Sequence, residues 1–197
     1  MKWQNEFPIL FKDKPDIWKL INEESTTLEL PKQWFKVRDL IKKSSILLQS
    51  LDELLIHWKP EFICNADIKM DNFLIEKGTN KIYWIDWERF CLADELWDVG
   101  GLLRLILFEH LKISKDLNLI LYDSVFQKRI SQIWRKVHSV NVNVSKDKLL
   151  LIWIASMLEK TLELIQEGSI NINTTYFLIE ICEEMKTKSN KIKYLFN

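Results

Sequence analysis

The chain has 197 residues, the size of one ordinary domain with a hydrophobic core. Its 28 basic and 28 acidic residues balance, and there is no run of five like charges that would mark a surface for nucleic acid or an anionic membrane, so neither is expected as a partner. The three cysteines are far apart and none lies in a CxxC pair, which excludes a disulfide framework and a zinc-site motif and favours a cytoplasmic location.

Residues 1–33 are predicted to form an N-terminal arm. This stretch holds three of the four prolines, and its one helical candidate, residues 16–23, starts directly after Pro15. Residues 34–58 carry apolar side chains at the three- and four-residue spacing of one helix face, and Lys59-Pro60 ends that pattern. The domain proper is therefore expected to span residues 34–197.

The spacing of apolar residues then becomes that of strands. Residues 62–64 form a short apolar run, and residues 73–75 and 82–85 flank the polar residues 76–80, which predicts a β-hairpin. Four helices are predicted to follow, over residues 96–111, 115–138, 145–167 and 173–187. The longest uncharged apolar stretch, residues 149–158, is half the length of a membrane span, so a soluble protein is expected. The element order predicts a mainly α domain with a small β-hairpin.

Glycine is scarce in this chain. Its four glycines are Gly78, Gly100, Gly101 and Gly168, and none precedes residue 78. Every motif in which a glycine-rich loop lets backbone amides approach the phosphates of a nucleotide is therefore absent from the sequence.

Three candidate functional residues bracket the predicted hairpin. Asp67 and Asn72 lie on the loop before it, and Asp86 follows its second strand. A carboxylate and an amide at this spacing can serve phosphoryl transfer, because the carboxylate can take the proton of an attacking hydroxyl while the amide oxygen binds a hard cation. The alternative is that these residues only form turns and cap backbone groups.

The order and spacing of these residues resemble those of a known family. The segment over residues 64–103 reads CNADIKMDNFLIEKGTNKIYWIDWERFCLADELWDVGGLL. It is similar to the catalytic core of the aminoglycoside phosphotransferase and choline kinase superfamily, whose members share the protein-kinase fold. That family has a His-Gly-Asp loop ending in Asn, a strand-turn-strand, an Ile-Asp-Trp-Glu run and a later Trp/Tyr-Asp pair. The last two correspond here to residues 85–88 and to Trp97-Asp98.

The resemblance implies an ATP- and magnesium-dependent phosphotransferase acting on a small-molecule hydroxyl. It assigns Asp67 as the catalytic base, Asn72 and Asp86 as magnesium ligands, and Asp98 as a structural residue that hydrogen-bonds the catalytic loop. Lys69 matches a lysine that neutralises the transferring phosphate in many protein kinases. A solvated loop lysine is the alternative for that position.

Two departures from the family pattern stand out. Asn65-Ala66 replaces the usual His-Gly, and Asn65 is expected to take over part of the structural role of the histidine. The family also carries a nucleotide-binding N-terminal lobe of about five strands and a helix, which needs on the order of 60 residues. Only 33 residues precede the predicted long helix. We therefore expect a truncated chain that carries the C-terminal catalytic lobe alone.

Two main hypotheses follow. The first is an enzyme that is incomplete without an N-terminal lobe from a second polypeptide. The second is a non-catalytic pseudokinase that serves as a binding module, and an all-helical structural protein with accidental motif matches is a third. Under the first two, the lobe surface that would meet an N-terminal lobe should expose apolar side chains, which favours a partner or self-association. Acidic residues on one predicted helix indicate either a cationic acceptor or a solvated helix face: Glu159, Glu163 and Glu167.

Overall fold

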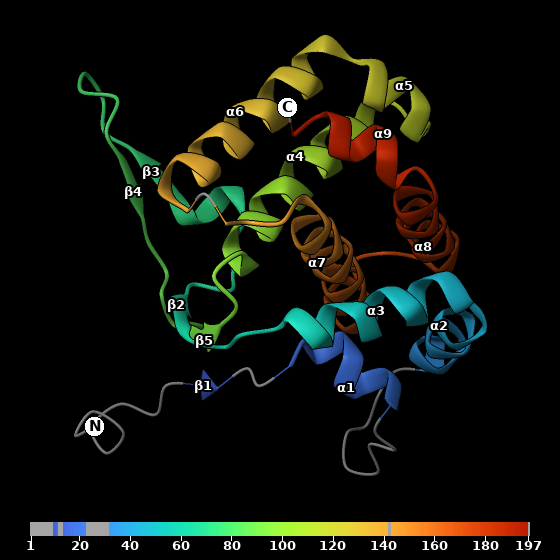
Figure 1. Cartoon of the computed structure of the whole chain (residues 1–197). Coiled ribbons are helices and arrows are strands. Elements are labelled where there is room, and N and C mark those ends of the chain that lie inside the picture. The colour runs from blue at the N-terminus through green and yellow to red at the C-terminus, as the bar shows by residue number, and fades with distance from the viewer. Residues whose placement is uncertain (1–9, 12–13, 23–31, 142, 197) are drawn as a thin grey trace.

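The computed structural model describes residues 10–11, 14–22, 32–141 and 143–196 (Figure 1). Its first elements are β1 (Leu10–Phe11), α1 (Asp16–Asn22), α2 (Lys32–Lys43) and α3 (Ser45–His57). The expected helix start after Pro15 is confirmed. The single helix expected over residues 34–58 is wrong, because the chain breaks at Ser44. The Ser44 side chain accepts a hydrogen bond from the backbone N–H of Leu47 and so caps a new helix.

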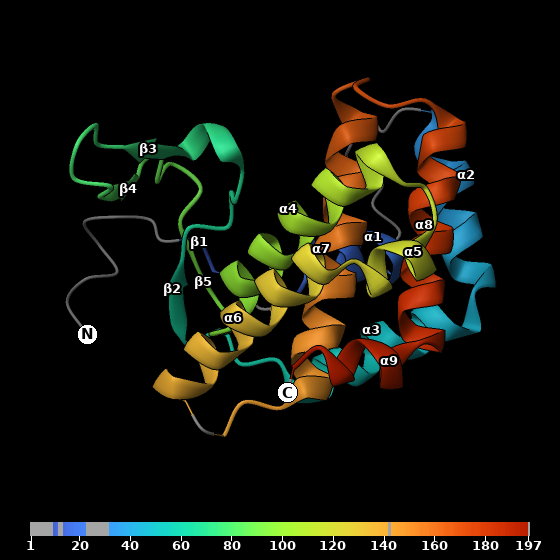
Figure 2. The ribbon, with the colours of Figure 1, turned by 90° about the horizontal axis from the view of Figure 1, so that it is seen from above.

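The strands in the described part of the chain form two small sheets. The predicted hairpin is present, with β3 (Phe73–Ile75) paired antiparallel to β4 (Ile82–Trp84). The second sheet has the order β1-β5-β2, in which β5 (Cys91–Ala93) pairs parallel with β1 and antiparallel with β2 (Phe62–Cys64). The hairpin projects away from the helices, and both views place the strands on one side of the helical body (Figures 1 and 2).

The rest of the described chain is helical. Six helices follow β5: α4 (Trp97–Ile113), α5 (Leu117–Tyr122), α6 (Ser124–Val140), α7 (Lys146–Gln166), α8 (Ile172–Thr187) and α9 (Ser189–Tyr194). The helix expected over residues 115–138 is two helices, because Asp123 accepts the backbone N–H of Phe126 and caps α6. The expected mainly α fold with a small hairpin is confirmed.

Helix α7 is the centre of the hydrophobic core. It contacts α1, α2, α3, α4, α8 and α9, and its residues 149–158 are all buried. The apolar stretch 149–158 is thus part of the hydrophobic core. Within the described residues no helix has the length and apolar character needed to cross a membrane. Residues assigned to the N-terminal arm contribute to the same core, since Ile17 and Ile21 of α1 are fully buried.

The described residues ahead of α3 form β1, α1 and α2 only. None of these described elements builds an antiparallel sheet of the kind expected for a nucleotide-binding lobe.

Two of the glycines lie in turns where the backbone has a positive φ. Gly78 lies in the hairpin turn with a φ of 93°, and Gly168 follows α7 with a φ of 68°.

Candidate active site

The loop between β2 and β3 is bound by hydrogen bonds to the first turn of α4. The carboxylate of Asp98 accepts the backbone N–H of Asn65 at 2.8 Å and that of Ala66 at 2.9 Å. Ala66 has a φ of 61°, a conformation that favours glycine and costs an alanine about 1 kcal/mol or more. Burial raises the pKa of Asp98, although the two backbone hydrogen bonds act in the opposite direction. Asp98 therefore fixes a strained turn immediately before Asp67.

Asn65 connects this loop to the far end of the hairpin. Its side chain is completely buried, accepts the backbone N–H of Asp67 at 3.0 Å and donates to the backbone carbonyl of Asp86 at 3.0 Å. Asp86 also has a left-handed backbone, with a φ of 62°. A single buried amide thus ties together the two turns that carry the acidic candidates.

Asp67 lies at the centre of the site, and its carboxylate is buried, with the hydrogen bonds concentrated on Oδ2. Oδ2 accepts a hydrogen bond from the ammonium of Lys69 at 2.7 Å and one from the amide of Asn72 at 3.1 Å. The same Asn72 nitrogen donates to the backbone carbonyl of Asp67 at 2.9 Å. Burial alone would raise the pKa of Asp67, but these hydrogen bonds and the positive charges of Lys69 and Arg89 hold it below the usual range of an aspartate. The carboxylate is therefore ionised at neutral pH.

Lys69 lies between the two acidic candidates. Its Nζ is 2.7 Å from Asp67 Oδ2 and 3.6 Å from Asp86 Oδ2. The hydrogen bond to Asp67 raises the pKa of Lys69, and Asp86 adds to this effect. A further link is the backbone hydrogen bond from Ile85 to the carbonyl of Asn72, which closes the base of the hairpin at 2.9 Å. The fold thus brings Asp67, Lys69, Asn72 and Asp86 to one place.

The donor atoms at this place are suited to a hard cation. Magnesium in proteins is commonly held by one or two carboxylates together with waters and substrate phosphates, and the Asn72 amide and Asp86 carboxylate supply protein oxygens of the right kind. Among the described residues no cluster of three or more His, Cys, Asp or Glu side chains forms a complete metal cage. The ammonium of Lys69 supplies positive charge between the two carboxylates, which is the charge that a cation would bring.

Arg89 is a site residue that was not predicted from the sequence. Its guanidinium lies 2.8 Å from Glu163 on α7 and 3.9 Å from Asp67. Glu163 also pairs with Lys160 at 2.7 Å. Burial would raise the pKa of Glu163, but Lys160 and Arg89 together lower it. The one feature of the sequence that pointed to Arg89 as a site residue is its position directly after the Ile-Asp-Trp-Glu run.

Glu159, Glu163 and Glu167 differ in their surroundings, although they recur at helical spacing. The Glu159 carboxylate accepts the backbone N–H groups of Asp16 and Ile17 at the start of α1, and Glu163 is paired as described above. Only Glu167 is exposed, as the solvated helix face predicts. The first two acids already bind partners within the protein.

A second residue missed in the sequence supports the loop from α4. Arg104 donates to the backbone carbonyl of Ile68 at 2.6 Å, and burial lowers the pKa of its guanidinium despite the nearby Glu163, Glu159 and Asp67. Gly101, one turn earlier, lies against the Ile68 side chain, where an added Cβ would be 2.8 Å from Cγ1. Helix α4 therefore supports Ile68, the residue next to Asp67, on two sides.

Comparison with known proteins agrees with this geometry. Residues 10–118, more than half of the chain, match the phosphotransferase enzyme family. The match covers the loop, the hairpin and α4, and it confirms the resemblance inferred from residues 64–103. No solved structure gives a significant match to the chain.

Proposed function

Because the chain belongs to the phosphotransferase enzyme family, we propose that it is the catalytic lobe of an enzyme that transfers a phosphoryl group from ATP to a small-molecule hydroxyl. The observation that carries this proposal is the position of Lys69 between the carboxylates of Asp67 and Asp86. This arrangement combines an ionised base with a positive charge at the point where phosphate charge would be neutralised.

In this proposal Asp67 accepts the proton of the acceptor hydroxyl as the new oxygen–phosphorus bond forms and the bond between the γ-phosphorus and the departing ADP oxygen breaks. The hydrogen bonds from Asn72 to the carboxylate and to the carbonyl of Asp67 orient the base. Lys69 offsets negative charge, while Asn65 and Asp98 keep the loop in shape. Asn72 and Asp86 would hold magnesium, which when bound supplies positive charge to the phosphates.

ATP fits the described residues less well. The four glycines of the sequence lie in the hairpin turn, within α4 and after α7, so none of them forms a loop that could hold the phosphates. We therefore assign no residue of this chain to the nucleotide. Positioning supplies much of the rate in phosphoryl transfer, so the chain is expected to turn over ATP poorly alone.

We propose that a β-rich nucleotide-binding lobe covers the hairpin. We define the hairpin surface as Leu74, Ile75, Ile82, Tyr83 and Trp87, and the exposed fraction of each of these residues is between 44% and 70%. A two-stranded hairpin is marginally stable by itself, and the exposure of several large apolar side chains close together is typical of an interaction site. The side chains belong to both faces of the ribbon, as expected for a hairpin that is enclosed by a partner.

The magnesium assignment is testable on the chain alone. In ¹H–¹⁵N spectra, Mn²⁺ should broaden the signals of Asn72 and Asp86 before those of distant residues, and Mg²⁺ should compete. Asp86→Asn should abolish the selective broadening, whereas Asp71→Asn, a change at an exposed neighbouring acid, should not. Equal broadening in the Asp86→Asn variant would contradict the assignment.

Catalysis is tested by co-expressing the chain with a neighbouring reading frame that encodes a glycine-containing, β-rich segment. Magnesium-dependent ATP turnover should appear in the complex and disappear in Asp67→Asn. A complex that forms without turnover and without magnesium-dependent stabilisation by ATP would exclude the enzyme and favour a pseudokinase binding module.

The proposed contact is tested separately by Ile75→Asp and Ile82→Asp. Both positions are exposed, so the chain should remain folded while binding of the second polypeptide is lost. Concentration-dependent self-association that these changes abolish would identify a second copy of the chain as the occupant instead.

A further inference from the structure

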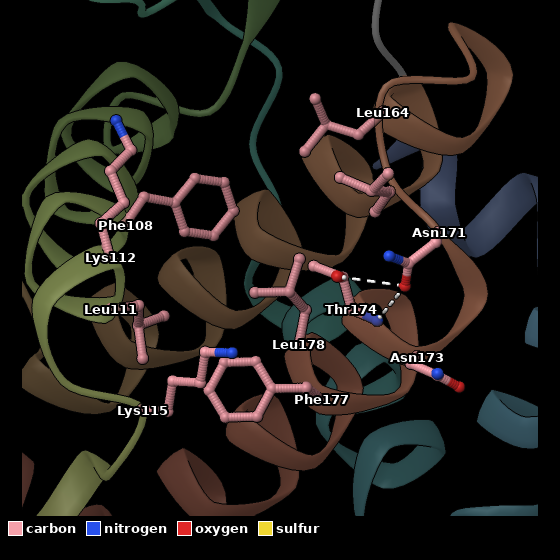
Figure 3. Close-up of a pocket in the computed structure, with 11 residues that line it drawn as sticks. Phe108, Leu111, Lys112, Lys115, Leu164, Asn171, Asn173, Thr174, Phe177 and Leu178 are labelled. Atoms are coloured by element: carbon pink, nitrogen blue, oxygen red, sulfur yellow. Dashed lines mark hydrogen bonds between the residues drawn. The ribbon is translucent and has the colours of Figure 1, made fainter.

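A cavity lies away from the acidic loop, between the last turns of α4, the loop after α7 and the start of α8. Its volume is about 640 Å³, within the range of small-molecule pockets. Six of its lining side chains are apolar: Phe108, Leu111, Leu164, Ile170, Phe177 and Leu178. Figure 3 shows both phenylalanine rings and the leucines arranged around the opening.

The charged side chains of the lining are both cationic. Lys112 and Lys115 contribute to the wall, and among the described residues that line the cavity there is no Asp or Glu. The two lysines differ in their pairing. Lys112 binds Glu109 at 2.6 Å, while Lys115 has no acidic partner within ion-pair distance in the described part of the chain.

Figure 3 shows that the side chains of the two lysines also point in different directions. The amine of Lys115 is directed toward Leu178, whereas that of Lys112 points away past Phe108. At the opposite wall, the carbonyl oxygen of the Asn171 side chain is occupied by the backbone N–H and the hydroxyl of Thr174. The available charged group beside the apolar wall is therefore the Lys115 ammonium.

We propose that this cavity binds an amphipathic monocarboxylate, with its apolar body against Phe108, Leu111 and Phe177 and its carboxylate on Lys115. Pockets that bind small molecules commonly combine a mostly apolar wall with a few polar groups that fix orientation, and this cavity has that composition. The positive charge and the lack of an acidic side chain in the described lining select an anion over a cation. The proposal does not depend on phosphotransferase activity.

Two of the helices that line the cavity, α4 and α7, also support the candidate active site. Phe108 lies one turn after Arg104, which holds the carbonyl of Ile68, and Leu164 follows Glu163, which pairs with Arg89. A ligand here would therefore contact elements that position the loop of Asp67.

The probes are octanoate, octylammonium and octanol, which have the same tail and differ in head group. Titration of the full chain should produce saturable shifts for residues 108–115 and 171–178 in ¹H–¹⁵N spectra, with octanoate binding most tightly. Intermolecular nuclear Overhauser effects should connect the octanoate methylenes to the rings of Phe108 and Phe177, a measurement that needs no variant.

Lys115→Gln should weaken octanoate binding about threefold, the size of an exposed ion contact, and should leave octanol binding unchanged. Lys112→Gln is the matched control, because this change removes the same charge from the same cavity at a side chain that points away. Equal losses in the two variants would indicate general charge attraction and overturn the proposal. Octylammonium binding as tight as octanoate, shifts elsewhere on the surface, or no saturable shift would each overturn it as well.

Discussion

The carboxylate of Asp98 accepts the backbone N–H of Ala66 at 2.9 Å and holds that residue at a φ of 61°. An L-residue with a side chain is strained in this region, and the family pattern has glycine at this position. The strain is located one residue before Asp67. The loop geometry is therefore set by Asp98 and its neighbours and not by the intrinsic preference of Ala66.

Ala66→Gly should leave the fold intact and change the free energy of unfolding by between zero and about 1 kcal/mol in the stabilising direction. The change relieves the left-handed strain, and the greater freedom of glycine in the unfolded chain offsets part of the gain. Ala66→Val should destabilise by about 1–3 kcal/mol, because a β-branched side chain tolerates positive φ poorly. Urea denaturation measures both, and a clear loss of stability in Ala66→Gly would contradict the backbone assignment.

Asp98→Ala should destabilise the protein by about 2–4 kcal/mol, because two backbone N–H groups lose their acceptor. Asp98→Asn should cost less, since one acceptor oxygen remains. The raised pKa of Asp98 also determines how the free energy of unfolding depends on pH. The favourable contribution of Asp98 to stability is full below the unfolded-state pKa of about 3.9 and is lost as pH rises through the folded-state pKa. Wild type minus Asp98→Asn should therefore show a stability difference that falls with rising pH in this window.

Lys69→Met should raise the pKa of Asp67, because the Lys69 hydrogen bond is the largest of the effects that lower it. In the wild type, Asp67 contributes stability above the unfolded-state pKa of about 3.9, and this contribution is lost as pH falls through the depressed folded-state pKa. Carboxyl ¹³C shifts followed by NMR across acidic pH report the Asp67 pKa directly. An unchanged titration in Lys69→Met would mean that the 2.7 Å contact is not maintained in solution.

The site could be anticipated from sequence because its charged members lie close together along the chain. Asp67, Lys69 and Asn72 share one loop, and a hairpin returns the chain to the same place, so Asp86 reaches them by local geometry. Arg104 could not be found in this way, and the acidic spacing that singled out Glu163 could not separate a site residue from a solvated helix face. Both residues reach the site only through the packing of α4 and α7.

Helix boundaries show the same limit. The apolar spacing over residues 34–58 is continuous, yet Ser44 divides it into α2 and α3. A serine within an apolar pattern is compatible with both a helix interior and a cap, and the choice depends on the tertiary contacts that bend the chain there. The hairpin was predicted correctly because its turn is marked by a polar segment with Gly78.

The cysteines should be unreactive in the folded protein. Burial raises the pKa of Cys64 to about 12 and also raises that of the fully buried Cys182, while Cys91 is buried without a disulfide. At pH 8 the native chain should therefore react with a thiol reagent only at the rate of its unfolding. In denaturant all three thiols should react at once, and rapid reaction of one native thiol would show that its surroundings open locally.

Gly101→Ala should disturb the active loop more than the global fold, and Gly100→Ala should do the opposite. Alanine normally stabilises a helix interior by about 1 kcal/mol over glycine, but both positions are obstructed. A Cβ on Gly101 would meet Ile68 beside Asp67, whereas one on Gly100 would lie 2.6 Å from Cγ2 of Ile152 and 3.2 Å from its backbone oxygen in the core helix α7. Gly100→Ala should therefore lose about 1–3 kcal/mol of stability through overpacking. In Gly101→Ala the contact is with Cγ1 and Cβ of Ile68, so the loop backbone has to move together with that side chain. The amide shifts of residues 65–72 and the Asp67 pKa should therefore change, with a smaller loss in urea denaturation. If the two variants gave the same stability and the same loop spectra, the close contact of α4 with the loop at Ile68 would be excluded.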